Sequence, residues 1–348
     1  MKVYDVIIIG GGQAGLSVAY FLRRSALEYL ILDDHKEAGG AWLETWDDLK
    51  LFSPSEYSSL SGWAMPKSNE EYPTKAEFIK YLSAYENRYD FPIQRPVKVF
   101  QVEKENGLFI TKTDKGDFYS KTLVSATGTA NKPFIPKYPN ATHFSGTQIH
   151  SVNYSNSDKF KDKNVLIVGG GNSGAQILAE VSKVAHTKWV TSNEPTFLPN
   201  DIDGRYLFNE ATLKYLGKTI KHSKDHSVSL ANIVMVKSVK EARSRDVLNA
   251  VRPFKEFYEH GVIWNDGTKE QFDAVIWCTG FRANLNHLES LNLTENNKIN
   301  TEGTRSIKES NLWLVGYGNW TGFASATIYG VGKTARETVK EITALLKR

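Results

Sequence analysis

The hydrophobic pattern near the N-terminus predicts a β-α-β unit. Residues Val3–Ile9 form a run rich in β-branched side chains, which is typical of a parallel strand buried on both faces. A glycine-rich turn follows, and a helical pattern extends from Ala14 to about Arg24. A second apolar stretch, Tyr29–Leu32, ends at Asp33. The order strand, helix, strand predicts two parallel neighbours in one sheet.

The same order returns in the middle of the chain. Val165–Val168 predicts a strand, Ala175–Val184 a helix and Lys188–Thr191 a second strand. A glycine-rich turn again follows the first strand. Two such units predict an α/β protein with two Rossmann-like dinucleotide-binding domains.

The other periodic segments predict elements that complete such domains. A helix is expected at Thr74–Arg88, because Thr74 and Glu77 form a capping box ahead of one apolar face. The remaining predicted elements are β-meanders at Val97–Ala126 and Phe257–Trp277, a strand at Leu312–Val315 and a long helix at Ala326–Leu346.

The segment Pro195–Arg252 is the least readable part of the chain. Within it, Arg205–Gly217 is expected to be helical and Ser223–Ser229 to be a polar loop. A substrate pocket lined by this segment would carry no sequence signature of its substrate.

Two histidines in that segment have the spacing of metal ligands. His222 and His226 are four residues apart, beside Asp225. The stretch is rich in Lys and Ser and offers no third ligand, so we interpret it as a solvated surface. No metal site is predicted.

Composition excludes several classes of protein. The 348 residues, of which 41% are hydrophobic, suffice to bury two cores. The net charge is only +4 and the charges are scattered, which argues against a nucleic-acid-binding or membrane-surface role. The single cysteine, Cys278, excludes an intrachain disulfide and a C-x-x-C redox pair and fits a reducing cytoplasm. The first apolar run is too short for a membrane span, so we interpret it as a strand rather than a signal peptide.

Each β-α-β unit carries a glycine loop suited to a dinucleotide. The first reads G-G-G-Q-A-G from Gly10 to Gly15, and the second reads G-G-G-N-S-G from Gly169 to Gly174. The glycines allow a tight turn, close approach of the pyrophosphate and close helix packing, and the helix amides face the phosphates. Asp33 stands 18 residues beyond Gly15, where an acid accepts hydrogen bonds from ribose hydroxyls.

The second unit lacks the corresponding acid. Its strand ends in T-S-N-E, from Thr191 to Glu194, with no acid at the ribose position and no arginine to pair a 2′-phosphate. The choice between NADH and NADPH is therefore open.

Five further motifs stand in a fixed order around these loops. They are G-G-A-W at Gly39–Trp42, S-A-T-G at Ser125–Gly128, F-x-G-x-x-x-H-x-x-x-Y at Phe144–Tyr154, C-T-G-F at Cys278–Phe281 and G-Y-G-N-W at Gly316–Trp320. Together with the two glycine loops, this order resembles the class B flavoprotein monooxygenases over essentially the whole chain. The chain looks closest to the short bacterial members, including those associated with arsenic- and metal-resistance operons.

The resemblance implies a fold of the three-layer ββα type, with an NAD(P)H-binding domain inserted into an FAD-binding domain. The FAD domain would comprise residues 1–158 and 276–348, and the NAD(P)H domain residues 159–275. The residues implied to bind FAD are Gly10, Gly12, Gln13, Ala14, Gly15, Asp33, Gly40, Trp42, Thr127, Gly128 and Asn319. Those implied to bind NAD(P)H are Gly169, Gly171, Asn172, Ser173, Gly174, Ser192, Asn193, Cys278, Thr279 and Gly280.

Two residues are candidates for a catalytic role by the same resemblance. Phe52 is expected near the flavin ring, where larger family members have an asparagine thought to support the peroxyflavin. His150 is expected to fix the connector and the coenzyme rather than to transfer protons, and the plainer alternative is a buried histidine that packs the linker. Asn319 stands in place of the usual aspartate and keeps an acceptor oxygen for FAD.

The implied activity is that of an FAD-dependent monooxygenase, which uses NADPH or NADH and O2 to oxygenate a soft nucleophile through a C4a-(hydro)peroxyflavin. Tyr154 ends the fingerprint where Baeyer–Villiger enzymes carry a Trp. Sulfoxidation or N-oxygenation is therefore expected ahead of a weak Baeyer–Villiger activity. The expected partners are a small-molecule substrate, O2 and a second copy in a homodimer, with no nucleic acid and no membrane, in the cytoplasm.

Two other functions remain open at this point. A reductase that passes NAD(P)H electrons to a disulfide or quinone shares both dinucleotide domains. A disulfide reductase needs a redox thiol beside the flavin, however, and Gln13 and Ala14 occupy the loop where some such enzymes place one. A flavin-bound redox sensor of a resistance operon is the non-enzymatic alternative. Oxygen-dependent consumption of NAD(P)H, with and without a thioether, separates the three.

Overall fold

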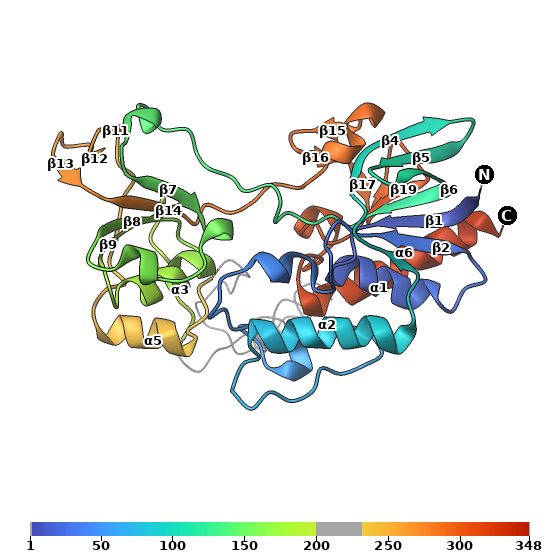
Figure 1. Cartoon of the computed structure of the whole chain (residues 1–348), viewed down its shortest axis with the longest axis horizontal. Helices are drawn as coiled ribbons and strands as arrows, with labels where there is room; N and C mark the ends of the chain where they lie inside the picture. The colour runs from blue at the N-terminus through green and yellow to red at the C-terminus, as the bar shows by residue number, and fades with distance from the viewer. Residues whose placement is uncertain (1, 200–231, 348) are drawn as a thin grey trace, which may run out of the picture. The chain divides into compact units, whose positions relative to one another are not determined.

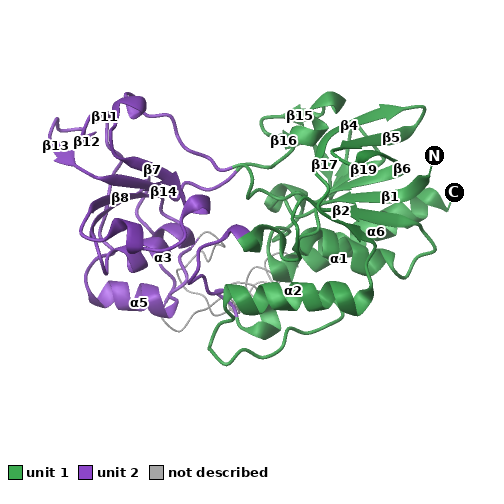
Figure 2. Cartoon of the chain, viewed as in Figure 1, with its two compact units in different colours: residues 1–43, 54–132, 282–348 green, residues 44–53, 133–281 purple. Residues whose placement is uncertain are grey.

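The computed structural model describes residues 2–199 and 232–347, which form two compact units (Figure 2). Unit 1 comprises Met1–Leu43, Pro54–Lys132 and Arg282–Arg348, and unit 2 comprises Glu44–Ser53 and Pro133–Phe281. Outside the described residues lie the helix expected at Arg205–Gly217, the loop expected at Ser223–Ser229 and the residues His222, Asp225 and His226.

Unit 1 is built on a nine-stranded sheet whose central strands are parallel. The sheet runs β17-β18-β19-β6-β1-β2-β3, and β4 and β5 continue from β6 as an antiparallel hairpin. Its strands are β1 (Val3–Ile9), β2 (Tyr29–Leu32), β3 (Ile93–Gln94), β4 (Val99–Glu105), β5 (Leu108–Thr113), β6 (Gly116–Ser125), β17 (Thr301–Glu302), β18 (Arg305–Ser306) and β19 (Leu312–Leu314). A separate hairpin joins β15 (Thr294–Glu295) and β16 (Lys298–Ile299).

Helices and the β4–β5 hairpin cover opposite faces of this sheet. Figure 1 shows α1 (Gln13–Leu22) and α6 (Ile328–Leu346) side by side on one face and the hairpin on the other. The helix α2 (Lys75–Tyr89) begins at the predicted capping box, since the Thr74 hydroxyl accepts from the Glu77 amide and the Glu77 carboxylate accepts from the Thr74 amide. Unit 1 therefore has the predicted three-layer arrangement.

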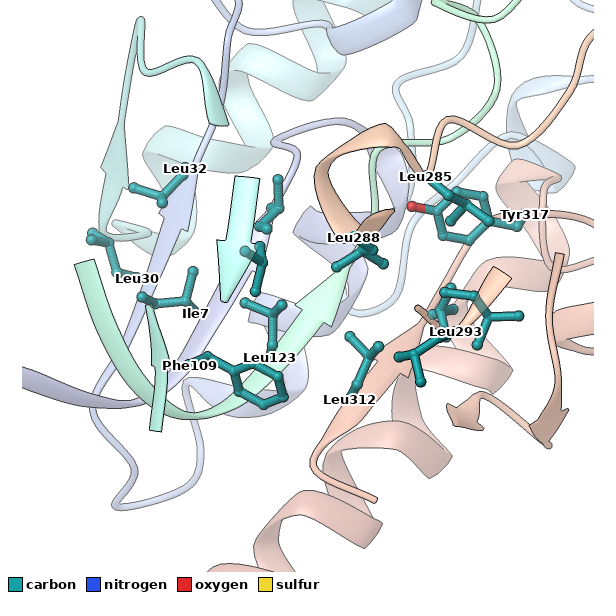
Figure 3. Packing of buried hydrophobic residues seen from close by; sticks show 14 of the residues in the cluster. Ile7, Leu30, Leu32, Phe109, Leu123, Leu285, Leu288, Leu293, Leu312 and Tyr317 are labelled. Atoms are coloured by element: carbon teal, nitrogen blue, oxygen red, sulfur yellow. The ribbon is translucent and has the colours of Figure 1, made fainter. Parts of the chain in front are cut away.

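The hydrophobic core of unit 1 explains the first apolar run. Ile7 and Ile9 of β1 belong to a hydrophobic cluster that includes Val102 of β4 and Phe109 of β5, and Figure 3 shows Ile7 within it. Val6 and Ile8 alternate to the other face and are equally inaccessible to water. Other members of the cluster shown in Figure 3 are Leu30, Leu32, Phe109, Leu123, Leu285, Leu288, Leu293, Leu312 and Tyr317. Both faces of β1 are buried, so the strand has no polar alternation in its second half.

Unit 2 contains the second β-α-β unit and a small antiparallel sheet. Its parallel sheet runs β10-β9-β8-β14-β7. The elements are β7 (Thr147–His150), β8 (Asn164–Val168), α3 (Asn172–Val181), β9 (His186–Val190), α5 (Lys237–Ser244), β10 (Ala250–Val251), β11 (Glu256–Tyr258), β12 (Gly261–Ile263), β13 (Lys269–Gln271) and β14 (Ala274–Trp277). Short 3-10 helices in the two units cover Gly40–Glu44, Ser55–Tyr57, Ala141–His143, Ser151–Asn153, Asp158–Phe160, Asn286–Leu291 and Asn319–Thr321.

Three features of unit 2 differ from the pattern expected. The helix α3 begins directly after Gly171, three residues earlier than the apolar period indicated, because the glycine itself is the N-cap. The second meander ends at β13, and β14 joins the parallel sheet instead. The connector strand β7 pairs with β14, so Phe144–Tyr154 packs in unit 2, whose longer segment is Pro133–Phe281. In the part of the chain that the structure describes, no helix has the length and apolarity to span a membrane.

Candidate functional site

The outer glycines of the two loops are required by contacts within the protein. Gly10 has φ +106°, and a Cβ there would lie 2.6 Å from the Ala126 carbonyl oxygen. A Cβ on Gly15 would lie 1.9 Å from the Gly10 carbonyl oxygen. In the second loop, a Cβ on Gly169 would lie 2.1 Å from the Cys278 carbonyl oxygen, and one on Gly174 would lie 2.1 Å from that of Gly169. These glycines make the turn and the close helix packing possible.

The middle glycines, Gly12 and Gly171, are different, because no steric contact among the described residues requires a glycine there. Among the described residues, the nearest atom to a Cβ on Gly12 would be the Gly40 Cα, at 3.8 Å, and a Cβ on Gly171 would meet nothing within 4 Å. Both have negative φ, so neither conformation demands glycine. Each is the N-cap of a helix that lacks a side-chain cap and an acid in its first turn. Space beside an uncapped helix N-terminus fits the pyrophosphate of a dinucleotide.

Three distant motifs converge on the first loop. A Cβ on Gly40 of G-G-A-W would lie 2.8 Å from the Gly12 Cα, and one on Gly316 of G-Y-G-N-W would lie 2.6 Å from the Ala14 Cβ. The S-A-T-G segment contributes the Ala126 carbonyl beside Gly10. The predicted FAD-binding motifs of unit 1 therefore meet at one place, the N-terminal end of α1.

Two predicted cofactor ligands use their side chains to hold the protein together. The Gln13 carboxamide accepts from the Trp42 indole N–H (3.0 Å) and donates to the Ala326 carbonyl (3.0 Å). The Asn172 carboxamide donates to the Asn232 carbonyl (3.1 Å) and accepts from the Val234 amide (2.9 Å). Each fastens a distant segment to the start of its helix and keeps one N–H and one acceptor lone pair beyond these contacts.

The acid expected at the ribose position is buried in a charged cluster. Asp33 follows β2 and is only 2% exposed. Its Oδ2 accepts from Arg95 Nε at 3.0 Å, and Arg95 also pairs with Glu86 at 2.6 Å. The His35 imidazole lies 3.4 Å from Asp33 Oδ1, and this carboxylate, with that of Asp34, raises the pKa of His35 to about 10. The sequence pattern pointed to Asp33 but not to its partners.

The end of β9 carries a cation that sequence reasoning missed. Arg252 follows β10, the strand beside β9, and its Nη1 donates to the Thr191 hydroxyl at 2.9 Å. Its Nη2 is paired with Glu194. Ser192 and Asn193, expected to contact the coenzyme, are exposed at this strand end. A two-residue strand gives too short a period to place Arg252 beside Thr191 in advance.

The residues of the two return segments are held by polar contacts. Thr127 Oγ1 donates to the Asn284 carbonyl at 2.7 Å, and the next residue, Gly128, has φ +63°. Thr279 Oγ1 donates to the Phe134 carbonyl, and Gly280 has φ +80°. Cys278 packs behind the second loop, where burial raises the pKa of its thiol to about 12. The thiol is therefore protonated near neutral pH, as expected for a small buried residue.

His150 is a neutral, fully engaged side chain. It is 2% exposed, and its Nδ1 accepts from the Val152 amide at 3.2 Å, which leaves the proton on Nε2. Nε2 lies 3.0 Å from the Gly280 carbonyl oxygen, which can accept that proton in a hydrogen bond. Burial lowers the pKa of His150 below its ordinary value. His150 thus ties the connector to the C-T-G-F segment, and the geometry favours positioning over proton transfer.

The structure gives the locations of the other predicted site residues, and their roles stay predictions. Tyr154, which ends the connector, is 2% exposed and stacks on Phe160. Phe52 is half-buried in unit 2, next to the buried Leu51. Asn319 is exposed and begins a 3-10 turn after Gly318, which has φ +95°. Ser173 lies in the first turn of α3.

Comparisons with known proteins agree with this arrangement. The sequence model of a family described as pyridine nucleotide-disulphide oxidoreductase matches residues 7–316. The chain is 44% identical to a flavin-containing monooxygenase from Stenotrophomonas maltophilia, whose solved structure superposes with a TM-score of 0.92 over 99% of this chain and 100% of that one.

Two curated relatives extend the comparison. The chain is 31% identical to the uncharacterized oxidoreductase CzcO of Bacillus subtilis, over 98% of this chain and 99% of the relative. It is 27% identical to the probable indole-3-pyruvate monooxygenase YUCCA4 of Arabidopsis thaliana, over 97% and 89% of the two chains. The chain therefore belongs to the pyridine nucleotide-disulphide oxidoreductase family, in which it groups with the flavin-dependent monooxygenases.

Proposed function

We propose that the protein uses NADPH and O2 to transfer one oxygen atom to a soft nucleophile, a thioether sulfur or an amine nitrogen. The observation that carries this proposal is the pair of glycine loops. In each loop the outer glycines avoid clashes with carbonyl oxygens, whereas a Cβ on the middle glycine would clash with none of the described residues. Two dinucleotides on one chain are what an NADPH-dependent flavoprotein requires.

We assign FAD to unit 1 and the nicotinamide coenzyme to unit 2. Three motifs converge on the first loop, and Asp33 follows its second strand, which supports FAD there. The backbone at Gly12 and the start of α1 would hold the FAD pyrophosphate, and Gly171 and the start of α3 that of NADPH. When bound, FAD supplies the redox chemistry, accepting hydride from NADPH and activating O2.

The residues of the chain would bind and orient the two dinucleotides and exclude water from the site. His150 holds the connector against Gly280 as a neutral side chain and donates no proton to the reaction. Phe52 offers no hydrogen-bond donor, so an activated oxygen species near it would lack that support. We expect part of the oxygen to leave as hydrogen peroxide rather than in product.

The burial of Cys278, the single cysteine of the chain, argues against a disulfide reductase that works through a protein thiol. A disulfide reductase attacks with a thiolate, but Cys278 is buried and burial raises the pKa of its thiol to about 12. An oxygen-transfer role fits better, because it requires no protein thiol. Tyr154 at the end of the connector supports sulfur or nitrogen as the atom oxygenated ahead of a ketone. A cytoplasmic location and a homodimer also remain predictions.

The experiment is a complete accounting of NADPH. The purified protein is supplied with NADPH, O2 and either a thioether or a tertiary amine, and NADPH consumed, oxygenated product and hydrogen peroxide are measured together. We expect product and peroxide to sum to the NADPH consumed, with product appearing only when substrate is present. Consumption that ends wholly in peroxide with every substrate would favour an NADPH oxidase instead.

A further inference from the structure

The Asp33 carboxylate is bound by the guanidinium of Arg95, which follows the neighbouring strand. Arg95 follows β3, which pairs with β2 in parallel, and its Nε and Nη2 lie 3.0 and 2.8 Å from Asp33 Oδ2. The backbone is pinned as well, because the Asp33 amide donates to Gln94 and the Val97 amide donates to Asp33. Asp33 Oδ2 is therefore fully committed to Arg95.

The adjacent edge of the same guanidinium, between Nη1 and Nη2, is bound by Glu86 of α2. Arg95 Nη1 donates to Glu86 Oε2 at 2.6 Å, and Nη2 donates to Oε1 at 2.9 Å, which is a bidentate pair. Glu86 is 9% exposed. The fork thus binds two buried carboxylates at once, which a lysine ammonium could not do with the same geometry.

The pair explains why the first loop has a glycine at its second position. A Cβ on Gly11 would lie 2.7 Å from Asp33 Oδ2 and 2.9 Å from Arg95 Nη2. The Asp33–Arg95 pair therefore occupies the space that a side chain at position 11 would need. The loop, the acid and the guanidinium are packed as one assembly.

The two oxygens of Asp33 are left unequal by this packing. Oδ2 accepts from the guanidinium, whereas Oδ1 has only the longer contact with His35, at 3.4 Å. Oδ1 is thus the oxygen with capacity to accept from a ligand hydroxyl. A carboxylate fixed in rotation costs less ordering when the ligand binds.

We propose that Arg95 is a positioning residue for FAD: by fixing Oδ2 of Asp33, it presents Oδ1 to the ribose hydroxyls beside the first glycine loop. This inference rests on the proposed placement of FAD in unit 1. The competing interpretation is that Arg95 only ties α2 to the sheet through Glu86. In the first interpretation FAD affinity depends on the contact between Arg95 and Asp33, whereas in the second interpretation Arg95 acts through its contact with Glu86.

The test compares Arg95→Met, Glu86→Gln and the double variant with the natural protein. For each flavin-loaded protein, the dissociation constant of FAD is obtained by serial dilution and separation of free flavin, and the unfolding temperature by circular dichroism. Glu86→Gln is the matched control, since it removes the charge and one of the two acceptors of Glu86 and leaves the Asp33 contact in place. The double variant relieves the unpaired Glu86 charge that Arg95→Met alone would bury.

We expect Arg95→Met and the double variant to raise the dissociation constant of FAD at least about tenfold, and Glu86→Gln to change it less than about threefold. The unfolding temperature of the double variant should exceed that of Arg95→Met, while its FAD affinity stays low. A double variant with natural FAD affinity would overturn the positioning role, and it decides the question if Arg95→Met does not fold. A natural protein that holds no FAD would overturn the proposed function itself, and this inference with it.

Discussion

At the scale of single residues, the positions most informative about cofactor binding are glycines that no contact within the described protein requires. Sequence reasoning predicted both glycine loops, because glycines at fixed spacing between strand and helix have few other uses. It could not distinguish Gly10 and Gly15, which face carbonyl oxygens, from Gly12, where a Cβ would make only an ordinary contact of 3.8 Å with the Gly40 Cα. That distinction depends on which atoms from distant segments pack against the loop.

Gly12 therefore offers a clean substitution. Its φ of −78° suits any residue, and a Cβ there would be 3.8 Å from its nearest neighbour, so Gly12→Val should fold. The branched side chain would occupy the place of the pyrophosphate, and we expect FAD affinity to fall at least about a hundredfold. The measurement is the ratio of FAD to protein after purification.

The matched control for Gly12→Val is Gly171→Val in the second loop, where a Cβ would lie within 4 Å of none of the residues that the structure describes. This variant should keep its FAD and lose rapid reduction of the flavin by NADPH. A yellow Gly12→Val protein, or a colourless Gly171→Val protein, would contradict the assignment of the two loops.

His35 predicts a pH dependence of stability. Hydrogen bonding to Asp33 and Asp34 raises its pKa from the ordinary 6.5 to about 10. Because the folded pKa is the higher one, the protonated imidazole stabilises the fold fully below pH 6.5, and this contribution is lost as the pH rises through about 10.

Urea unfolding of the natural protein and of His35→Gln checks this expectation. The difference in unfolding free energy between the two should be largest near pH 6 and should shrink towards pH 10. A difference that stays constant across this range would show that His35 does not titrate as its neighbours indicate.

At the scale of elements, long periodic segments were predictable and short ones were not. The strand β1 and the helix α2 carry their own signals, a buried apolar run and a capping box. By contrast, α5 buries only Val239 and Ala242, and β10 has two residues, so neither gives a clear period. The cation Arg252 at the end of β10 was missed for this reason.

The paired ends of β9 and β10 should set coenzyme choice. We propose that Arg252 lies near the coenzyme ribose but that Glu194 neutralises it, so NADPH and NADH should reduce the flavin with efficiencies within about tenfold. Glu194→Gln should free the guanidinium for a 2′-phosphate and shift the preference towards NADPH by about tenfold or more. The measurement is kcat/KM for flavin reduction with each coenzyme.

Two further variants control this prediction. Arg252→Gln should move the preference towards NADH, and Ser192→Arg should move it towards NADPH, since each changes one cation at the same strand end. A preference of a thousandfold or more in the natural protein would show that another charge reads the ribose. Unchanged ratios in Glu194→Gln and Arg252→Gln would exclude this pair as the selector.

At the scale of the whole molecule, the order of motifs predicted the family and the α/β fold, while the limits of the compact units followed from pairing that no local pattern shows. The connector strand β7 lies beside β14, which is more than a hundred residues later in the chain. Residues 133–158 therefore pack with unit 2, although their motif had been grouped with the FAD-binding segment. Which cofactor each unit holds stays a prediction.

The central claim is that the protein places one atom of O2 in an organic product at the expense of NADPH. Turnover of a thioether under ¹⁸O2, followed by mass spectrometry of the product, tests it most directly. The claim predicts a sulfoxide that carries one ¹⁸O atom, formed only with NADPH and absent from a flavin-free Gly12→Val protein. A sulfoxide that carries only oxygen from water, or oxidation of NADPH without labelled product from any thioether or amine, would contradict it.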